Sequence, residues 1–279
     1  MSTPIPQLPP VAFIGGGNMA SAILGGLLRA GLPASAFEVV EPWDEARARL
    51  QRDFGIAAQA APGEALARCG VFVWAVKPQV FGEAARAAQP FAGQALHLSV
   101  AAGIPSQSIA AWLGTGRIVR AMPNTPALVG QGMTGLFARP AAGEADRAAV
   151  EQLLAPTGQH LWVQDEALLD AVTAVSGSGP AYVFFFIEAM AEAGTEMGLP
   201  AQDALRLAVG TFTGASALAA ASNEPPAVLR ERVTSKGGTT HAAITSMQAA
   251  GVKEQFKAAI RAAQRRAGEL AAQFGQPSA

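Results

Sequence analysis

The sequence predicts a two-domain α/β protein in which a doubly wound parallel sheet precedes an all-α domain. Two observations support this fold class. The first half of the 279-residue chain alternates short apolar runs with longer amphipathic segments, whereas from about Ala167 long alanine-rich segments replace the β-branched runs. We therefore expect residues 8–165 to form the sheet domain and residues 166–279 to form the helical domain.

The first domain is expected to contain parallel strands connected by helices. The run from Val71 to Val76 is apolar throughout, which is typical of a strand that helices cover on both faces. Alternation of strands and helices implies right-handed crossovers between parallel strands. Strands are predicted at 11–14, 37–40, 71–76, 96–100 and 117–121, and helices at 18–30, 45–54 and 104–112.

The second domain is expected to be entirely helical and to associate with a second copy. Several of its helices are apolar around much of their circumference, and one short bundle cannot bury them all. We therefore expect a helical dimer interface. Breaks at glycine and proline separate the predicted helices, which cover 180–197, 201–221, 227–233, 240–250 and 252–274.

Composition argues against several classes of function. The chain has 20 basic and 21 acidic residues, a net charge of −1, so there is no basic excess for nucleic acid. One cysteine, Cys69, and three scattered histidines predict no disulfide and no metal site. The N-terminus lacks the basic segment of a signal peptide, and the most apolar stretch, 171–190, is interrupted by SGSGP. We expect a soluble, cytoplasmic protein that contacts no membrane.

A glycine-rich turn after the first predicted strand indicates a dinucleotide site. Residues 15–20 fit the pattern G-x-G-x-x-A. In this pattern Gly15 permits the tight turn, Gly17 lets the backbone approach a pyrophosphate, and Ala20 lets the helix pack on the sheet. The N–H groups and dipole at the helix start then bind the diphosphate. In this position the pattern predicts a Rossmann-type nucleotide-binding domain.

Three further residues follow predicted strands at the carboxyl edge of the sheet, where ligands bind. Glu41 either hydrogen-bonds the ribose hydroxyls of NAD and repels the extra phosphate of NADP, or is a surface carboxylate before Pro42. Lys77 is either part of the site or a solvated charge. Asn124 lies in a stiff turn that either only ends a strand or brings the amide to a nicotinamide ribose or carboxamide.

A second glycine-rich loop, residues 234–240, opens a helix in the predicted helical domain. Its N–H groups and hydroxyls suit a small carboxylate. The alternative is a helix N-cap in which Thr239 or Thr240 satisfies the first amides, and both interpretations can hold at once. Glu166, just before the helical half, also has two interpretations. It either contributes to the site or only stabilises a helix, as an acid in a first helical turn does.

Six segments together resemble one family, the pyrroline-5-carboxylate reductases. They run in the family order over nearly the whole chain. The resemblance implies an oxidoreductase that uses NAD(P)H to reduce Δ1-pyrroline-5-carboxylate to L-proline, the last step of proline biosynthesis. It also implies a homodimer through the helical domain, with a decamer of five dimers as a further option. The segments are FIGGGNMASAILGGLL, WAVKPQV, SVAAGI, RAMPNTPALVGQGMTGLFA, LLDAVTAVSGSGPAYVFFFIEAMAEAG and RVTSKGGTTHAAI.

The resemblance, together with Glu41, assigns residues to each ligand. The cofactor, NADPH or NADH, is expected to contact Ile14, Gly15, Gly16, Gly17, Asn18, Met19, Glu41, Val76, Lys77, Pro78, Ala101, Ala102 and Asn124. The substrate is expected to contact Glu166, Ser235, Gly237, Gly238, Thr239 and Thr240, with the loop supplied by the partner subunit. The loop amides would bind the substrate carboxylate. Thr240, as the catalytic residue, and Glu166 would support the ring nitrogen, directly or through water. Because a protonated imine is already electrophilic, the reaction mainly requires orientation.

Three residues depart from the family pattern. Lys236 stands where the family usually has proline, and its charge would attract the anionic substrate. Glu41 stands where many members place a small hydroxyl residue for the NADP phosphate, and Pro62 where an asparagine often touches the adenosine ribose. The last two weaken any expectation of strict NADPH use.

Two other functions are compatible with this architecture. The β-hydroxyacid and 6-phosphogluconate dehydrogenases need a helix lysine shortly after a glycine-rich segment, but here SGSGP is followed by AYVF. A non-catalytic, dimeric NADP-binding protein would keep the fold without turnover. The presence of Glu166 and of Gly238 to Thr240 argues against that interpretation, so we favour the reductase.

Overall fold

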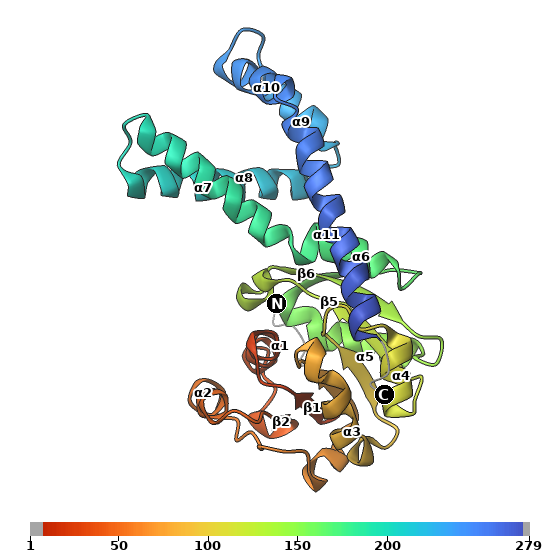
Figure 1. Ribbon diagram of the computed structural model, residues 1–279. Coiled ribbons are helices and arrows are strands. Elements are labelled where there is room, and N and C mark those ends of the chain that lie inside the picture. The colour runs from red at the N-terminus through yellow and green to blue at the C-terminus, as the bar shows by residue number, and fades with distance from the viewer. Residues whose placement is uncertain (1–7, 276–279) are drawn as a thin grey trace. The chain divides into compact units, whose positions relative to one another are not determined.

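The computed structural model describes residues 8–275, which form two compact units (Figure 1). One unit comprises the chain up to Gly177 together with the stretch from Ala263 onward, and the other runs from Ser178 to Ala262. The first unit thus includes residues 166–177 and the end of the last helix, which the sequence analysis assigned to the helical domain. Both pieces pack against the sheet domain: Val172 lies against Gly135, and Leu270 lies against Gly103.

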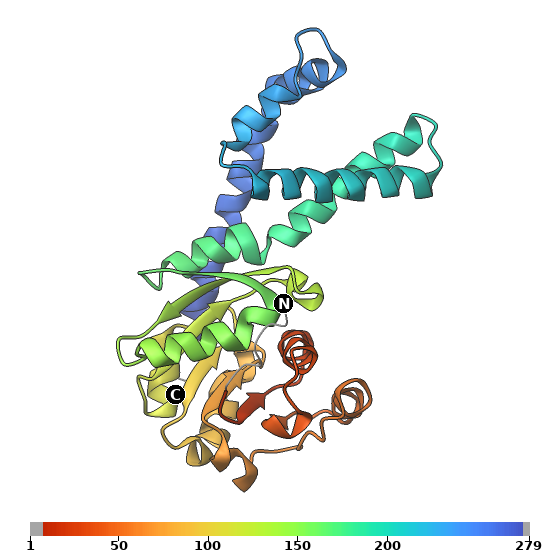
Figure 2. The same ribbon diagram turned by 180° about the vertical axis from the view of Figure 1, so that it is seen from behind.

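The first unit is built on a sheet, which Figure 2 shows from behind. The sheet has seven strands in the order β2-β1-β3-β4-β5-β6-β7. Val11 of β1 pairs with Phe37 of β2 on one side and with Val71 of β3 on the other. The switch point of this doubly wound sheet therefore lies between β1 and β3. The strands are β1 (Val11–Ile14), β2 (Phe37–Val40), β3 (Val71–Trp74), β4 (Leu96–Ser99), β5 (Ile118–Met122), β6 (Gly132–Ala138) and β7 (Gly158–Trp162).

The five strands expected from the sequence are present and parallel, so the predicted sheet is confirmed. Two more strands, β6 and β7, were not expected, and β6 runs antiparallel to β5. β6 contains two glycines, Gly132 at its start and Gly135 within it, and packing leaves no room for a side chain at either position. A Cβ on Gly132 would lie 2.8 Å from the carbonyl oxygen of Thr157, and one on Gly135 would lie 2.7 Å from Val172. Glycine lowers β propensity, so tertiary packing rather than local preference places this strand.

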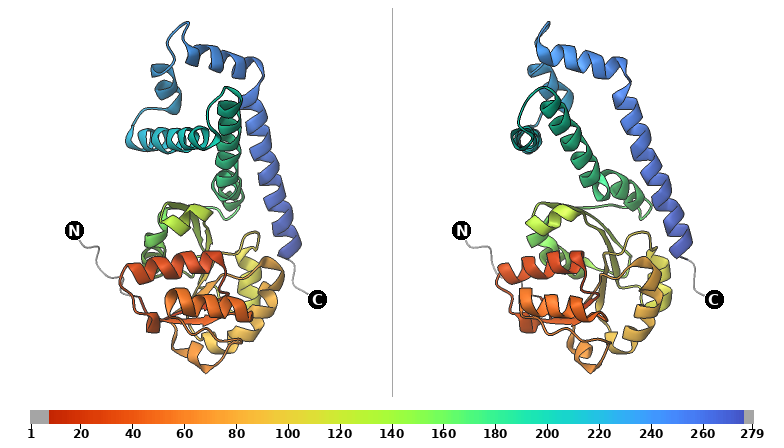
Figure 3. Two further views of the ribbon diagram at one scale, coloured as in Figure 1. Left: turned by 90° about the vertical axis from the view of Figure 1, so that its left-hand side faces the viewer. Right: turned by 60° about the vertical axis from the view of Figure 1, so that its left-hand side comes forward.

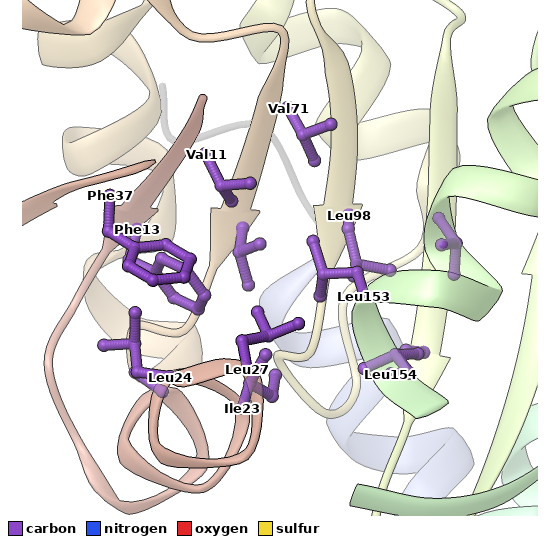
Figure 4. Packing of buried hydrophobic residues seen from close by; sticks show 14 of the residues in the cluster. Val11, Phe13, Ile23, Leu24, Leu27, Phe37, Val71, Leu98, Leu153 and Leu154 are labelled. Atoms are coloured by element: carbon purple, nitrogen blue, oxygen red, sulfur yellow. The ribbon is translucent and has the colours of Figure 1, made fainter. Parts of the chain in front are cut away.

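Helices cover both faces of the sheet. On one face, Ile23, Leu24 and Leu27 of α1 and Leu153 of α5 pack against Phe13 and its neighbours (Figure 4). On the other face, α3 and α4 pack against the alternate residues of the same strands. The side chains of each strand alternate between the two faces, so both are apolar. These helices are α1 (Asn18–Arg29), α2 (Asp44–Phe54), α3 (Phe81–Ala92), α4 (Ser106–Leu113), α5 (Glu144–Leu154) and α6 (Leu168–Val172).

The second unit is helical, as the sequence predicts, and its helix bounds agree with the predicted ones to within one residue. Helices α7 and α8 form a hairpin in which Gly194 allows the close approach of Ala204. The last helix continues without a break from this unit into the first (Figure 3). The helices are α7 (Gly179–Glu196), α8 (Ala201–Ala221), α9 (Pro226–Arg232), α10 (Thr239–Ala249) and α11 (Val252–Phe274).

Apolar side chains remain exposed on this unit. Phe184 and Phe185 of α7 are 63% and 65% exposed, and Leu218 of α8 is 72% exposed. Two stretches, Leu168–Glu196 and Ala201–Ala221, are long and apolar enough to cross a membrane, judged by length and composition alone. An apolar surface of this extent requires a cover that the described residues of one chain do not provide.

A buried histidine lies in the core of the first unit. His97 of β4 is 1% exposed, and its Nδ1 accepts a hydrogen bond of 3.1 Å from Nε1 of Trp74 on β3. The ring of Phe72, also on β3, lies close by, with its centroid 5.6 Å from that of His97. Burial lowers the pKa of His97 to about 4, and the positive charge of Arg117 contributes. The imidazole is therefore neutral at physiological pH.

We expect acid to destabilise the protein through His97. Its pKa is about 4 in the folded state against an ordinary value of 6.5, so the unfolded chain binds more protons between these values. The contribution of the neutral His97 side chain to the free energy of unfolding is fully present above about pH 6.5. It is lost as the pH falls toward 4. Thermal unfolding across this range should show a smaller drop in stability for His97→Asn than for the wild type, although the variant is less stable at neutral pH. His241→Asn, at an exposed position, serves as the control. Parallel curves for His97→Asn and wild type would show that folding does not lower the pKa of His97.

Candidate active site

The turn between β1 and α1 approaches the end of β3 closely. Gly15 has φ +99°, a conformation that favours glycine. A Cβ at this position would lie 2.6 Å from the carbonyl oxygen of Ala75, which is far inside contact distance. The Gly15 N–H donates a hydrogen bond of 2.8 Å to the carbonyl oxygen of Val40. The turn is therefore held between the carboxyl ends of β2 and β3, at the switch point of the sheet.

The start of α1 fits a pyrophosphate. Gly17 is exposed, and a Cβ built on it would have no described atom within 4 Å. No side chain of the described residues caps α1, and its first turn carries no acidic residue. The first N–H groups of the helix are thus available to an anion, and the helix dipole favours one there. The geometry expected for the motif is present.

Glu41 has a defined position beside this turn. Its Oε2 accepts the Gly16 N–H at 2.8 Å, and its Oε1 accepts the Trp43 N–H at 3.0 Å. A carboxylate has about four acceptor positions, so about two remain for other donors. Glu41 is therefore held by the chain and is not a freely solvated carboxylate. Contact with a cofactor itself stays a prediction.

Sequence reasoning missed Trp43, which follows Glu41 by two residues. Its side chain is 70% exposed at the start of α2. The carboxyl end of β2 is on the adenosine side of the switch point in sheets of this kind, so an exposed indole here suits a purine ring. The only signal in the sequence was an isolated tryptophan in a polar segment.

The remaining predicted cofactor residues gather at the same edge of the sheet. Ile14 ends β1 and the residues up to Met19 follow it, Val76 to Pro78 follow β3, and Ala101 and Ala102 follow β4. Val76 borders the glycine-rich turn, because its Cγ1 lies 3.1 Å from the Cβ position of Gly15. Lys77 and Ala102 are exposed, whereas Ala101 is buried. The strands that carry these segments are parallel, so their carboxyl ends meet at one edge.

Asn124, after β5, connects three segments of the chain. Its Nδ2 lies 3.2 Å from both the carbonyl oxygen and the Oγ of Ser176, and its Oδ1 accepts the Met133 N–H at 2.9 Å. Ser176 belongs to a π-helical turn, Thr173–Gly177, that ends the first unit. π-Turns of this kind are frequent at functional sites. The amide is therefore already engaged within the chain, and its predicted contact with nicotinamide stays a prediction.

Glu166 is engaged in the same way. Its Oε1 accepts the Ser106 N–H at 2.6 Å, its Oε2 accepts the Ser106 hydroxyl at 2.5 Å, and Nη1 of Arg120 lies 2.7 Å from Oε1. Sequence reasoning assigned no role to Ser106 or Arg120. Both are buried polar residues inside regular elements, and Arg120 was noted only as the first residue of the RAMPNTP segment. The predicted role of Glu166 as a substrate ligand is not tested by these contacts, but they give its carboxylate another task.

The second glycine-rich loop begins α10 in the other compact unit. Gly238 is the N-cap, and no side chain among the described residues caps the helix. The interpretation in which Thr239 or Thr240 only caps α10 is therefore not supported. Gly237 has φ +79°, and the Gly238 N–H donates to the carbonyl oxygen of Ser235 at 3.0 Å. Ser235, Gly237 and Thr239 are exposed, and Thr240 is half-buried, so the loop is accessible to a small anion.

Comparison with known proteins points to one family. Residues 166–270 match the family described as pyrroline-5-carboxylate reductase dimerisation, and residues 10–103 match NADP oxidoreductase, coenzyme F420-dependent. The chain is 46% identical to pyrroline-5-carboxylate reductase of Pseudomonas aeruginosa, over 96% of this chain and 99% of that protein. It is 36% identical to the reductase of Pisum sativum, over 93% of this chain and 95% of that protein.

Solved structures agree with this result. A pyrroline-5-carboxylate reductase from Coxiella burnetii superposes with a TM-score of 0.89 at 33% identity, covering 97% of this chain and 100% of that one. The Plasmodium falciparum pyrroline carboxylate reductase with NADP bound superposes with a TM-score of 0.85 at 26% identity, covering 94% of this chain and 98% of that one.

Substitution of the two turn glycines should separate backbone strain from ligand contact. We expect Gly15→Ala to lose stability by about 1–3 kcal/mol, because both φ and the Ala75 carbonyl exclude a side chain. Gly17→Ala should unfold like the wild type yet bind NADPH at least about 10-fold more weakly, because its methyl group enters space that a pyrophosphate needs. Thermal unfolding of the apoprotein and titration of NADPH fluorescence measure the two effects. If Gly17→Ala binds NADPH normally, the turn does not hold the pyrophosphate.

Proposed function

Because the chain belongs to the pyrroline-5-carboxylate reductase family, we infer that it reduces Δ1-pyrroline-5-carboxylate to L-proline with NAD(P)H. The observation that carries this inference is 46% identity to a reductase of that name over 96% of the chain. The dinucleotide-binding turn and the accessible loop before α10 supply the two kinds of site that such a reaction needs. The reaction is the last step of proline biosynthesis.

The sheet domain binds and orients the cofactor. Bound NAD(P)H supplies the hydride that reduces the C=N bond of the substrate. The free amides at the start of α1 would hold its pyrophosphate, with Glu41 at the adenosine ribose. Val76 to Pro78 and the segment at Ala101 and Ala102 would line the rest of the site, because they follow β3 and β4 at the same edge.

The loop before α10 binds the substrate. The amides of Gly237, Gly238 and Thr239 would donate hydrogen bonds to its carboxylate, with the Gly238 N–H shared with the Ser235 carbonyl oxygen, and the exposed Lys236 would attract the same charge. The Thr240 hydroxyl would hydrogen-bond the ring nitrogen as it changes from iminium to amine. These contacts fix the substrate in one orientation, which is the main requirement of a reaction whose imine is already electrophilic. We propose that the loop comes from the partner subunit.

The apolar faces of α7 and α8 are proposed to be covered by a second copy of the chain. These helices lie within the residues that match the dimerisation family. A homodimer would bury Phe184, Phe185 and Leu218, so the apolar length of the two helices needs no membrane to explain it. Five such dimers in a decamer remain part of the proposal, as does a cytoplasmic location. The net charge of −1 argues against a nucleic acid partner, because there is no basic excess to neutralise phosphates.

The activity can be tested directly by following NADPH and NADH absorbance with pyrroline-5-carboxylate as substrate. We expect turnover by the wild type and a kcat about 100-fold lower for Thr240→Ala, because the ring nitrogen loses its hydrogen-bond partner. Thr211→Ala is the matched control, since that hydroxyl donates only to the Leu207 carbonyl within α8. A wild type inactive with both cofactors would contradict the proposed function. An unchanged kcat and KM for Thr240→Ala would contradict the role of Thr240 but would leave the proposed reaction standing.

Glu41 is expected to make NADH a better cofactor than is usual for the family. The fixed carboxylate would accept ribose hydroxyls and repel a 2′-phosphate. Replacement by serine should therefore lower the Kd of NADPH relative to that of NADH by about 10-fold, the scale of one partly screened charge pair. Fluorescence titration of both cofactors measures the ratio, with Glu45→Ser, a nearby residue on α2, as control. An unchanged ratio would show that Glu41 does not select the cofactor.

A further inference from the structure

We propose that Arg49 of α2 determines cofactor specificity by binding the 2′-phosphate of NADPH, so that the site accepts NADPH although Glu41 is placed to repel that phosphate. The inference rests on the proposed function in one respect, namely that the turn between β1 and α1 binds a nicotinamide dinucleotide. Arg49 lies in none of the motifs that indicated the cofactor site. Its contacts in the folded chain carry the argument.

The guanidinium of Arg49 reaches the glycine-rich turn. Its Nη2 donates a hydrogen bond of 3.3 Å to the carbonyl oxygen of Gly16, 33 residues earlier in the chain. This bond is long for an N–H donor, and a guanidinium has several further N–H groups, so most of its donors remain for another acceptor. A cation with free donors therefore lies beside the turn that receives the dinucleotide.

Arg49 is directed to this turn although its own helix offers it acidic partners. Residues about one turn apart lie on the same face of a helix, which brings Glu45 and Asp53 within reach of Arg49. Within the described part of the chain, Arg49 forms an ion pair with neither acid, and Asp53 pairs with Arg52 at 2.9 Å. The half-buried Arg49 side chain bonds Gly16 instead. The direction of the guanidinium is therefore set by the glycine-rich turn rather than by the charges of α2.

Glu41 and Arg49 bond the same residue of the turn. Oε2 of Glu41 accepts the Gly16 N–H at 2.8 Å, whereas Arg49 donates to the carbonyl oxygen of that residue. The start of α2 packs closely here, because a Cβ on Gly16 would lie 2.6 Å from Cδ1 of Leu50 and 3.4 Å from Cβ of Glu41. The acid and the base thus lie together at the carboxyl end of β2, which is the adenosine side of the switch point in sheets of this kind.

The two charges have opposite effects on the two cofactors. An acid at the end of β2 bonds the ribose hydroxyls of NADH, and the 2′ hydroxyl is the group that carries the extra phosphate in NADPH. A phosphate monoester carries about −1.5 to −2 charges near pH 7, so Glu41 repels it. Arg49 supplies the opposite charge next to Glu41, and its planar guanidinium can bond a phosphate group in a bidentate manner. The pair therefore lets one site bind either cofactor.

The neighbouring Arg47 is committed to the chain and leaves this role to Arg49. Its Nη1 donates to the carbonyl oxygens of Glu41 and Pro42, at 2.9 and 2.7 Å. Its Nη2 is paired with Asp44. These bonds fix the connection between β2 and α2 and use the donors of Arg47 on both sides of its guanidinium. Of the two arginines, Arg49 is the one with donors to spare for a phosphate.

Cofactor binding to the protein tests the proposal without any turnover. Arg49→Gln removes the charge but keeps a polar side chain. Fluorescence titration should give a Kd for NADPH about 10-fold higher than that of the wild type and a Kd for NADH changed by less than about twofold, because only NADPH carries the 2′-phosphate. Arg49→Lys, which keeps the charge but loses the planar fork, should recover part of the affinity. Calorimetric titration with 2′,5′-ADP and 5′-AMP, which differ only in the 2′-phosphate, should show the same selective loss.

The matched control is Arg52→Gln, which removes a positive charge from the same helix at a residue that pairs with Asp53. It should leave the Kd of both cofactors unchanged. The proposal is wrong if Arg49→Gln raises the Kd of NADPH and NADH equally, since Arg49 would then serve the diphosphate or only the turn. It is also wrong if neither Kd changes. In both cases a wild type that turns over pyrroline-5-carboxylate keeps the proposed function, whereas a wild type that binds neither cofactor contradicts both proposals.

Discussion

The approach of Gly15 to the carbonyl group of Ala75 is the constraint on which the nucleotide site depends. A distance of 2.6 Å from that oxygen to a hypothetical Cβ leaves no room for any other residue. The close approach places the first turn over the end of β3, at the switch point of the sheet. It also lets the Gly16 amide reach Glu41 at 2.8 Å and leaves Gly17 facing open space. One steric requirement thus sets the position of the backbone amides at the start of α1 and of the acid beside them.

The loops further along the same edge are held by a different means. Each depends on a polar side chain whose partners are distant in sequence: Asn124 bonds to Ser176 in the π-helical turn, and Glu166 caps α4 at Ser106. Both contacts satisfy backbone groups that would otherwise be left without partners at the ends of regular elements. They also involve the segments that connect the sheet domain to the helical unit. The carboxyl edge of the sheet is therefore held by these connecting segments as well as by the strand ends.

The helical unit leaves apolar residues exposed, because its own helices do not cover them. Membership of a family with a named dimerisation segment over residues 166–270 gives this surface a function. The chemistry is compatible with such a division of labour. Reduction of an electrophilic imine needs a well-placed hydride donor and a well-oriented anion more than a strong acid or base. In the proposed function, the edge of the sheet would place the hydride donor and the loop before α10 would orient the anion.

The amino-acid sequence by itself determined the doubly wound sheet, the nucleotide-binding turn and the helical second half, because hydrophobic period, glycine position and helix breaks are local properties. Only the tertiary structure decided the antiparallel strand β6, whose glycines are required by Thr157 and Val172 rather than by strand propensity. The same holds for Asn124 and Glu166. As isolated residues they suited a ligand equally well, but they meet their partners across 52 and 60 residues of chain. Hydrogen bonds over such separations follow from how the elements pack, which no local pattern records.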